Sequence, residues 1–133
     1  MAKFELEIVT PEKTLYSGTV EHVRAPGTDG GFGVLSRHHP MVSALSVGLL
    51  RFREEGGVEK QAAVGGGFAE VLGDRVTVLA ETAELAESID VERAVASRDR
   101  AKERLKSRRD PDVDDARAEA ALNRALNRLR VAG

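Results

Sequence analysis

The sequence predicts an α+β protein, with an N-terminal antiparallel β-sandwich followed by a C-terminal antiparallel two-helix hairpin. All five aromatic residues lie within the first 70 positions, and bulky side chains of this kind fill small sandwich cores. No glycine occurs between Glu81 and the last residue, where Ala, Glu and Arg dominate instead, a composition that favours helix. We therefore expect a sandwich over residues 1–85 and a helical hairpin over residues 86–133.

The sandwich is predicted by alternating apolar residues and by turns. Phe4, Leu6 and Ile8 alternate with charged residues, so they share one face of a strand. Farther along, residues 54–57 and residues 73–74 read as turns between apolar stretches, which predicts two β-hairpins. Short strands at such spacing are typical of an antiparallel sandwich or barrel.

The boundaries of two helices can be read from their capping residues. Ser88 or Asp90 is placed to cap the first helix, and Asp90 suits the positive end of the helix dipole. The segment Asp110-Pro111-Asp112 ends that helix. Either Asp112 or Asp114 can then cap the second helix.

The predicted hairpin has little apolar surface to hold it. Leu122, Leu126 and Leu129 recur at helical spacing and form a narrow apolar stripe. The remaining candidates for the helix interface are alanines, which permit close approach but bury little area: Ala94, Ala101, Ala118, Ala121 and Ala125. At about 25 cal/mol per Å² such an interface gains only a few kcal/mol, so we expect a hairpin that can detach.

Two glycine-rich runs resemble phosphate-binding loops but lack their chemistry. The run from Gly27 to Gly33 has no Lys-Ser/Thr after it and no helical pattern follows. We expect a turn there, with glycines at positive φ or in close backbone contact. For Gly65, Gly66 and Gly67 the expected role is a bulge or tight packing.

The chain offers little for catalysis or metal binding. It has no cysteine and three histidines, and His38 and His39, adjacent on a strand, would point to opposite faces. No combination of serine, histidine and aspartate marks a nucleophile with its base. We therefore expect neither a metal site nor an active site.

Charge differs in sign between the two halves. The first 89 residues hold 8 Lys and Arg against 13 Asp and Glu, whereas the remaining residues hold 12 against 9. This asymmetry is consistent both with a hairpin that meets an anionic partner and with a solvated helical face that mixes both charges. The hairpin has no aromatic residue for base stacking, so nucleic-acid binding is not expected.

Arginines on both predicted helices recur at helical spacing. Arg93 and Arg100 share a face of the first helix, and Arg124 and Arg128 share a face of the second with Arg117. Converging guanidinium groups would bind a polyphosphate or a partner's carboxylates. Spacing alone favours the alternative, a solvated face offset by nearby carboxylates.

The order of these features resembles the epsilon-subunit family of F-type ATP synthases, whose mitochondrial counterpart is called delta. The resemblance covers nearly the whole chain. Its most specific segments are Ile8-Val9-Thr10-Pro11-Glu12, residues 33–40, Gly66-Gly67-Phe68 and Ala125-Leu126-Asn127-Arg128-Leu129. It implies the same sandwich and hairpin, in a non-catalytic rotor subunit of a proton-translocating synthase.

The same resemblance implies the partners. The sandwich would pack on the gamma subunit and on the membrane ring of c subunits. The hairpin would lie folded on the sandwich or extend toward the alpha and beta subunits, and the extended form would inhibit ATP hydrolysis. The alternative is a free-standing adaptor whose hairpin binds an acidic protein partner.

Some bacterial members of that family bind ATP at the folded hairpin through the pattern Ile/Leu-Asp-x-x-Arg-Ala. This chain reads Ile89-Asp90-Val91-Glu92-Arg93-Ala94. The resemblance implies that Glu84 and Asp90 contact the adenosine and that Ile89 and Ala94 form an apolar wall. The phosphates would face four arginines: Arg93, Arg100, Arg124 and Arg128. On this basis ATP is a regulatory ligand, and the solvated-face interpretation is replaced.

One segment departs from the family's pattern. The family commonly has Pro-Gly where this chain has Ser36-Arg37, just before His38. Arginine adopts positive φ less freely than glycine, so the loop shape differs. Arg37 and His38 are the expected partner contacts in this loop.

The location expected for the chain is the cytoplasmic face of the bacterial inner membrane. The charged N-terminal residues do not form the apolar core of a secretory signal. No apolar run approaches the roughly 20 residues that span a bilayer, so membrane attachment would be through the complex alone.

Overall fold

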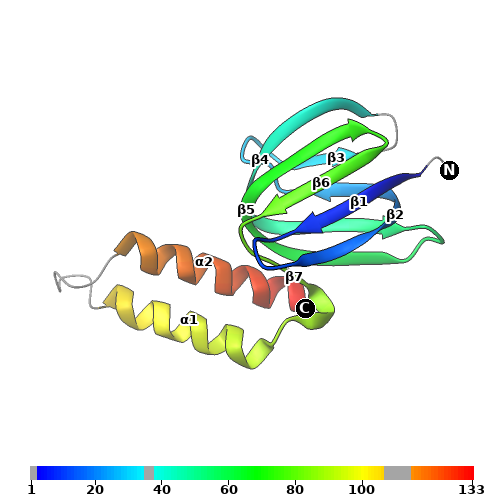
Figure 1. Cartoon of the computed structure of the whole chain (residues 1–133). Helices are drawn as coiled ribbons and strands as arrows, with labels where there is room; N and C mark the ends of the chain where they lie inside the picture. Colours follow the sequence, from blue (N-terminus) through cyan, green and yellow to red (C-terminus); the bar gives the residue numbers. More distant parts are fainter. Residues whose placement is uncertain (1–2, 35–37, 107–114) are drawn as a thin grey trace.

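The computed structural model describes residues 3–34, 38–106 and 115–133. It confirms the predicted fold class, a β domain followed by two helices (Figure 1). The strands are β1 (Phe4–Val9), β2 (Thr14–Ala25), β3 (Phe32–Val34), β4 (His38–Glu54), β5 (Glu59–Gly73), β6 (Arg75–Ala80) and β7 (Ala83–Leu85). A 3-10 turn, η1 (Ala86–Ser88), leads to α1 (Val91–Lys106) and then α2 (Asp115–Ala132).

The strands follow the order β1-β6-β5-β4-β2-β3, and β1 also pairs with β2, so the sheet closes on itself. All pairings are antiparallel except that of β1 with β6, which is parallel. The sequence predicted only antiparallel pairs. The parallel pair arises because β1 inserts between β2 and β6 and buries its apolar face, formed by Phe4, Leu6 and Ile8, in the core.

The predicted hairpins and the glycine roles are confirmed. β4 and β5 are joined at residues 55–58, and β5 and β6 at Asp74. Gly30 lies in the β2–β3 loop with φ of 120°. Gly67 has φ of 117°, and a Cβ there would lie 2.1 Å from the Leu79 carbonyl oxygen of β6. Only glycine allows β5 and β6 to approach so closely.

Asp90 is the residue that caps α1. Its Oδ1 accepts a hydrogen bond from the Arg93 backbone N–H at 3.0 Å, which decides between the two predicted caps. Residues 110–112 and Asp114, predicted to separate and cap the helices, lie outside the described residues.

The predicted leucine stripe on α2 is wrong in part, because Leu126 is 36% exposed. The predicted interface residues Ala118 and Ala125 are buried, as is Val131, and Leu122 and Leu129 are half-buried. On α1 the buried residues are Ala94 and Ala101. Alanine side chains are short, so the two helices approach each other more closely than they could with longer side chains between them.

α2 lies between α1 and the sandwich (Figure 1) and contacts β4, β5 and η1. The hairpin is therefore attached to the sandwich mainly through one helix.

Among the described residues, no helix is long and apolar enough to cross a membrane.

Replacing Gly67 with alanine is expected to destabilise the fold more than replacing Gly30. The two glycines have φ of 117° and 120°, so the conformational cost is matched at roughly 1–3 kcal/mol. Only at Gly67 does the new Cβ meet backbone, whereas nothing lies within 4 Å at Gly30. Urea unfolding should show a further loss of about 1–3 kcal/mol for Gly67→Ala. Equal losses for both variants would contradict the close β5–β6 packing.

Candidate functional site

A polar pocket of about 260 Å³ opens where the hairpin meets the sandwich. Its walls come from β7, η1 and α1, which follow one another in the sequence, and from α2, which is the last element of the chain. The lining residues are Glu84, Ser88, Asp90, Arg93, Ala94, Ser97 and Arg128. We call this the hairpin pocket.

The charged side chains of the hairpin pocket are in different states of pairing. Arg128 Nε donates to Glu84 Oε1 at 2.5 Å, which joins α2 to β7. Asp90 is engaged at the N-terminus of α1. Within the described parts of the chain, the Arg93 guanidinium makes no ion pair. The pocket therefore offers one unpaired cation beside one paired one.

Five of the eight predicted ATP-binding residues line this pocket, and the list is Glu84, Asp90, Arg93, Ala94 and Arg128. Arg100 lies next to it, because its Nη2 donates to the Ser97 hydroxyl at 3.1 Å. Ile89 is half-buried at the end of η1 but does not line the pocket. Arg124 lies against the sandwich, with its Cδ 3.5 Å from the position of a Cβ on Gly65.

The two predicted partner contacts cannot be placed in the same way. Arg37 lies outside the described residues. His38 begins β4, where its backbone pairs with Gly73 of β5.

Sequence reasoning missed Ser88 and Ser97, which add hydroxyl groups to the pocket. Ser97 lies four residues after Arg93 and so on the same helix face, a signal that could have identified it. Ser88 was considered only as a cap.

Asn127 was also missed as a contact between the hairpin and the sandwich. It is only 4% exposed. Its side-chain amide donates to the carbonyl oxygens of Gly48 at 2.9 Å and Val64 at 3.5 Å. The immediate neighbours do not distinguish this buried asparagine from the exposed Asn123, because each follows Ala-Leu and precedes Arg.

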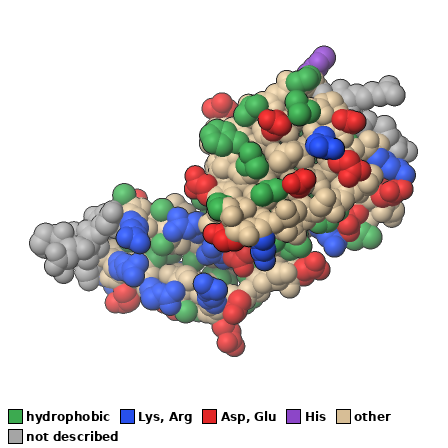
Figure 2. Space-filling view, in the orientation of Figure 1, with side chains coloured by type: hydrophobic (Ala, Val, Ile, Leu, Met, Phe, Trp, Pro, Cys, Tyr) green, Lys and Arg blue, Asp and Glu red, His purple; other side chains and the backbone are tan. Residues whose placement is uncertain are grey.

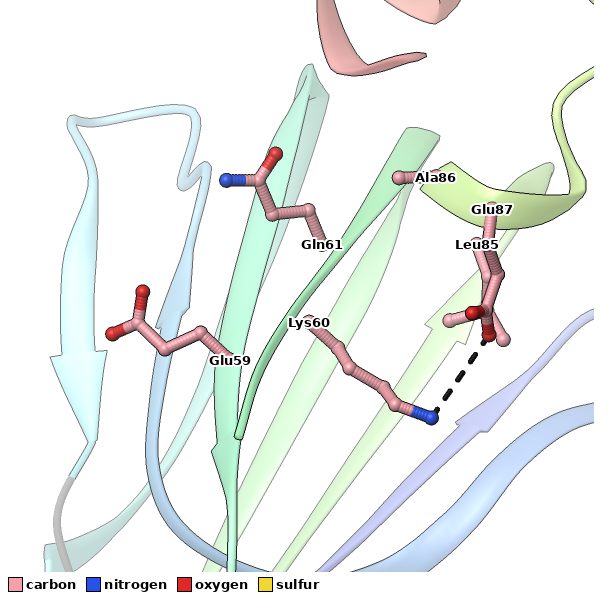
Figure 3. Close-up of a pocket in the computed structure, with 6 residues that line it drawn as sticks. All are labelled: Glu59, Lys60, Gln61, Leu85, Ala86 and Glu87. Atoms are coloured by element: carbon pink, nitrogen blue, oxygen red, sulfur yellow. Dashed lines mark ion pairs between the residues drawn. The ribbon is translucent and has the colours of Figure 1, made fainter. Parts of the chain in front are cut away.

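A second depression, of about 270 Å³, lies between β5 and η1 (Figure 3). Lys60 extends there toward Glu87, at 3.9 Å, and also lies 3.4 Å from Glu54. Tyr16 donates to Glu54 at 2.8 Å, and burial together with this carboxylate raises the pKa of Tyr16 well above its usual value. The ion pair of Lys60 with Glu87 joins β5 to η1, but none of the predicted site residues lines the depression.

Side chains of different kinds gather on different parts of the surface (Figure 2). Lys and Arg gather on the helical hairpin, while a group of apolar side chains lies on the sandwich. Among the described residues, no cluster of three or more His, Cys, Asp or Glu could hold a metal ion.

Comparison with known proteins identifies the family. The model of the ATP synthase delta/epsilon chain β-sandwich domain matches residues 3–86. The model of the long α-helix domain of the same chain matches residues 87–133. The chain belongs to the ATP synthase delta/epsilon-chain family. Together the two matches cover almost the whole sequence.

Individual relatives agree with this assignment. The ATP synthase epsilon chain of Desulforamulus reducens is 50% identical, over 99% of this chain and 99% of its own length. That of Symbiobacterium thermophilum is 51% identical, over 100% of this chain and 95% of its own length. The predicted epsilon-subunit family is thereby confirmed, as is the prediction of a non-catalytic subunit.

Solved structures show the same fold. A chain in the Euglena gracilis mitochondrial ATP synthase OSCP/F1/c-ring structure matches with a TM-score of 0.80 and 26% identity, covering 96% of this chain and 79% of that chain. A chain in the Tetrahymena thermophila mitochondrial central stalk/c-ring structure, 16% identical, matches with a TM-score of 0.57 and covers 98% of this chain and 93% of that chain.

Replacing Asn127 with alanine is expected to loosen the hairpin. The substitution removes two hydrogen bonds and leaves buried carbonyl groups, a cost of roughly 1–3 kcal/mol. Amide hydrogen exchange of α2 should then be about tenfold faster, because a local opening is favoured. Exchange in β1 and β6 should stay unchanged.

Asn123→Ala is the matched control, since Asn123 is exposed on the same helix. It should leave the exchange of α2 unchanged or slower. If Asn127→Ala and Asn123→Ala gave the same exchange rates, the amide of Asn127 would not be holding the helix.

Proposed function

We propose that the chain is a central-stalk rotor subunit of a proton-translocating F-type ATP synthase, and that ATP in the hairpin pocket stabilises its folded hairpin. One observation carries the regulatory part of the proposal. The hairpin pocket is built from β7, α1 and α2 together, so a ligand inside it would contact all three.

The chemistry of the pocket suits a nucleotide. Arg93 and Arg128 can make charge-assisted hydrogen bonds to phosphate oxygens, and two hydroxyl groups lie beside them. Ala94 gives a small apolar surface, while Glu84 and Asp90 can accept hydrogen bonds from the adenosine. At about 260 Å³ the pocket holds part of a nucleotide. The phosphates would extend along α1 toward Arg100, which already contacts the pocket through Ser97.

Binding to this pocket would act on the position of the hairpin. If the helices left β7, Arg128 would separate from Glu84 and the pocket would no longer exist. A ligand that binds only the folded form, at 100 times its dissociation constant, favours that form by about 2.7 kcal/mol. A shift of that size can move a hairpin that contacts the sandwich mainly through α2, so the nucleotide can decide its position.

The released hairpin would inhibit ATP hydrolysis by extending toward the alpha and beta subunits. Its surface carries many Lys and Arg side chains (Figure 2), which suit carboxylates on such a partner. The chain would thus sense ATP without hydrolysing it, and a fall in ATP would release the inhibitor.

The sandwich supplies a separate surface for the rest of the rotor. Val42, Phe68, Leu72 and Leu79 are exposed apolar residues of β4, β5 and β6, and Phe68 is 55% exposed. Phe68 pairs with Ala44 on one side and Leu79 on the other, while Val42 lies opposite Glu70, so these apolar side chains form a patch that includes one exposed carboxylate. Such a patch is typical of a protein interface, and we assign it to the gamma subunit, with the membrane c-subunit ring as second partner.

This function would place the chain at the cytoplasmic face of the bacterial inner membrane, attached through the complex. The alternative function, a free-standing adaptor, would bind some other acidic protein partner in place of the gamma subunit. A tagged chain that recovered no gamma subunit from its own cells would favour the adaptor.

ATP binding should depend on Arg93 and not on a nearby arginine outside the pocket. Arg93→Gln removes a charge-assisted contact to phosphate worth roughly 1.5–3 kcal/mol, so the dissociation constant should rise at least tenfold. Calorimetric titration of the full chain with ATP would measure it. Arg98→Gln is the control, since Arg98 pairs with Asp99 away from the pocket. No binding of ATP to the unaltered chain at millimolar concentration would end the proposal.

A further inference from the structure

Two arginines on the outer face of the sandwich lie directly opposite each other. Arg24 of β2 and Arg51 of β4 are partners in the strand register, and both are exposed. Like charges at opposed positions of neighbouring strands destabilise a sheet. Within the described residues, neither arginine forms an ion pair.

The strands on either side supply no compensating charge. β3 places Gly33 beside Arg24, and β5 places Gln61 beside Arg51. The row across four strands therefore reads Gly, Arg, Arg, Gln. It contains two cations and no carboxylate.

The adjacent row on the same face is built differently. Arg53 of β4 lies opposite Glu59 of β5, and the two form an ion pair at 3.2 Å. Figure 3 shows Glu59 and Gln61 on the same side of β5, with Lys60 on the other. The sheet thus neutralises one arginine from within, and at the equivalent place beside Arg51 it has an uncharged amide.

The two arginines also border a depression of about 330 Å³. Its floor includes Pro26, Gly27 and Gly31 of the β2–β3 loop, with Ser46 and Leu49 of β4. The Arg24 guanidinium lies over Gly31, because a Cβ there would be 3.6 Å from its Nη2. A side chain at Gly31 would occupy space that a ligand could use.

This floor is fastened to β4 by backbone and side-chain hydrogen bonds. The Ser46 N–H and hydroxyl donate to the Pro26 carbonyl at 2.8 and 3.2 Å. The Thr28 N–H donates to the Ala44 carbonyl at 2.9 Å. The depression is held in shape before anything binds, which lowers the entropy cost of binding.

We propose that Arg24 and Arg51 form a docking site for an aspartate or glutamate side chain on a neighbouring subunit of the ATP synthase. A carboxylate placed between the two guanidinium groups would accept hydrogen bonds from both and remove their repulsion. The depression is shallow and formed by exposed residues, which suits a side chain carried on a protein surface. The inference rests on the proposed packing of the sandwich against other subunits.

The test compares affinity with stability. Full-length chain would be titrated onto the host ATP synthase from which this subunit has been removed. Arg24→Gln and Arg51→Gln should each weaken binding by about tenfold, the loss of one charge-assisted contact. Raising the salt concentration should weaken the binding of the unaltered chain to the depleted synthase more than the binding of either variant. The isolated variants should melt no lower than the unaltered chain, because a repulsive pair has been removed.

Two further variants control for general charge effects. Arg53→Gln removes the same charge from the same strand and face, but that arginine already has Glu59, so affinity should stay within about twofold. Gln61→Glu would give Arg51 a partner within the sheet, and it should weaken binding while raising the melting temperature.

Several results would overturn the inference. Unchanged affinity in Arg24→Gln and Arg51→Gln would do so, as would an equal loss in Arg53→Gln or a lower melting temperature in the arginine variants. Inorganic phosphate that raised the melting temperature of the unaltered chain, but not of Arg51→Gln, would instead identify a site for a free anion. If the unaltered chain failed to bind the depleted synthase, the proposed rotor function would fail as well, so the two failures are distinguishable.

Discussion

The close approach of α2 to a stretch of small residues on β4 and β5 positions the whole hairpin. Gly48 and Val64 are paired neighbours in the sheet, and both of their carbonyl groups accept hydrogen bonds from Asn127. Gly65 follows directly, and a Cβ there would lie 2.1 Å from the Thr82 hydroxyl. Because Arg128 comes one residue after Asn127, the same contact brings it to Glu84. The hairpin pocket exists as a consequence of this approach.

Among the described residues, an ion pair also joins the hairpin to the sandwich. The ion pair of Arg128 with Glu84 is partly exposed, and pairs of that kind contribute about 0–1 kcal/mol. The free energy of docking is therefore small beside that of the sandwich, whose core is continuous. A weakly docked element on a stable domain is the arrangement that a ligand or a partner can move.

Features set by neighbouring residues could be predicted from the sequence, whereas contacts between distant residues could not. Alternation predicted the buried face of β1, and the glycine runs predicted tight turns and close packing. The parallel pairing of β1 with β6 depends on which edges remain free, which no local pattern records. The leucine stripe was wrong only at Leu126, which follows the buried Ala125 directly, because helical spacing does not tell which neighbouring element covers a side chain. The charged lining of the pocket came from the family resemblance, but Ser97 and the docking role of Asn127 came only from the folded structure.

The pairing of each arginine determines what it can do for a ligand. Arg128 already has Glu84, so a phosphate group that took this guanidinium would have to displace a carboxylate or share it. Arg93 has no such competitor among the described residues, and its full charge is available. Binding to the hairpin pocket would then gain more from Arg93 than from Arg128, although both line it. The net affinity proposed for ATP would then be smaller than two free arginines would give. A smaller affinity would suit the proposed sensor of a nucleotide that cells keep at high concentration, because a site that was always full could not respond to a fall in ATP.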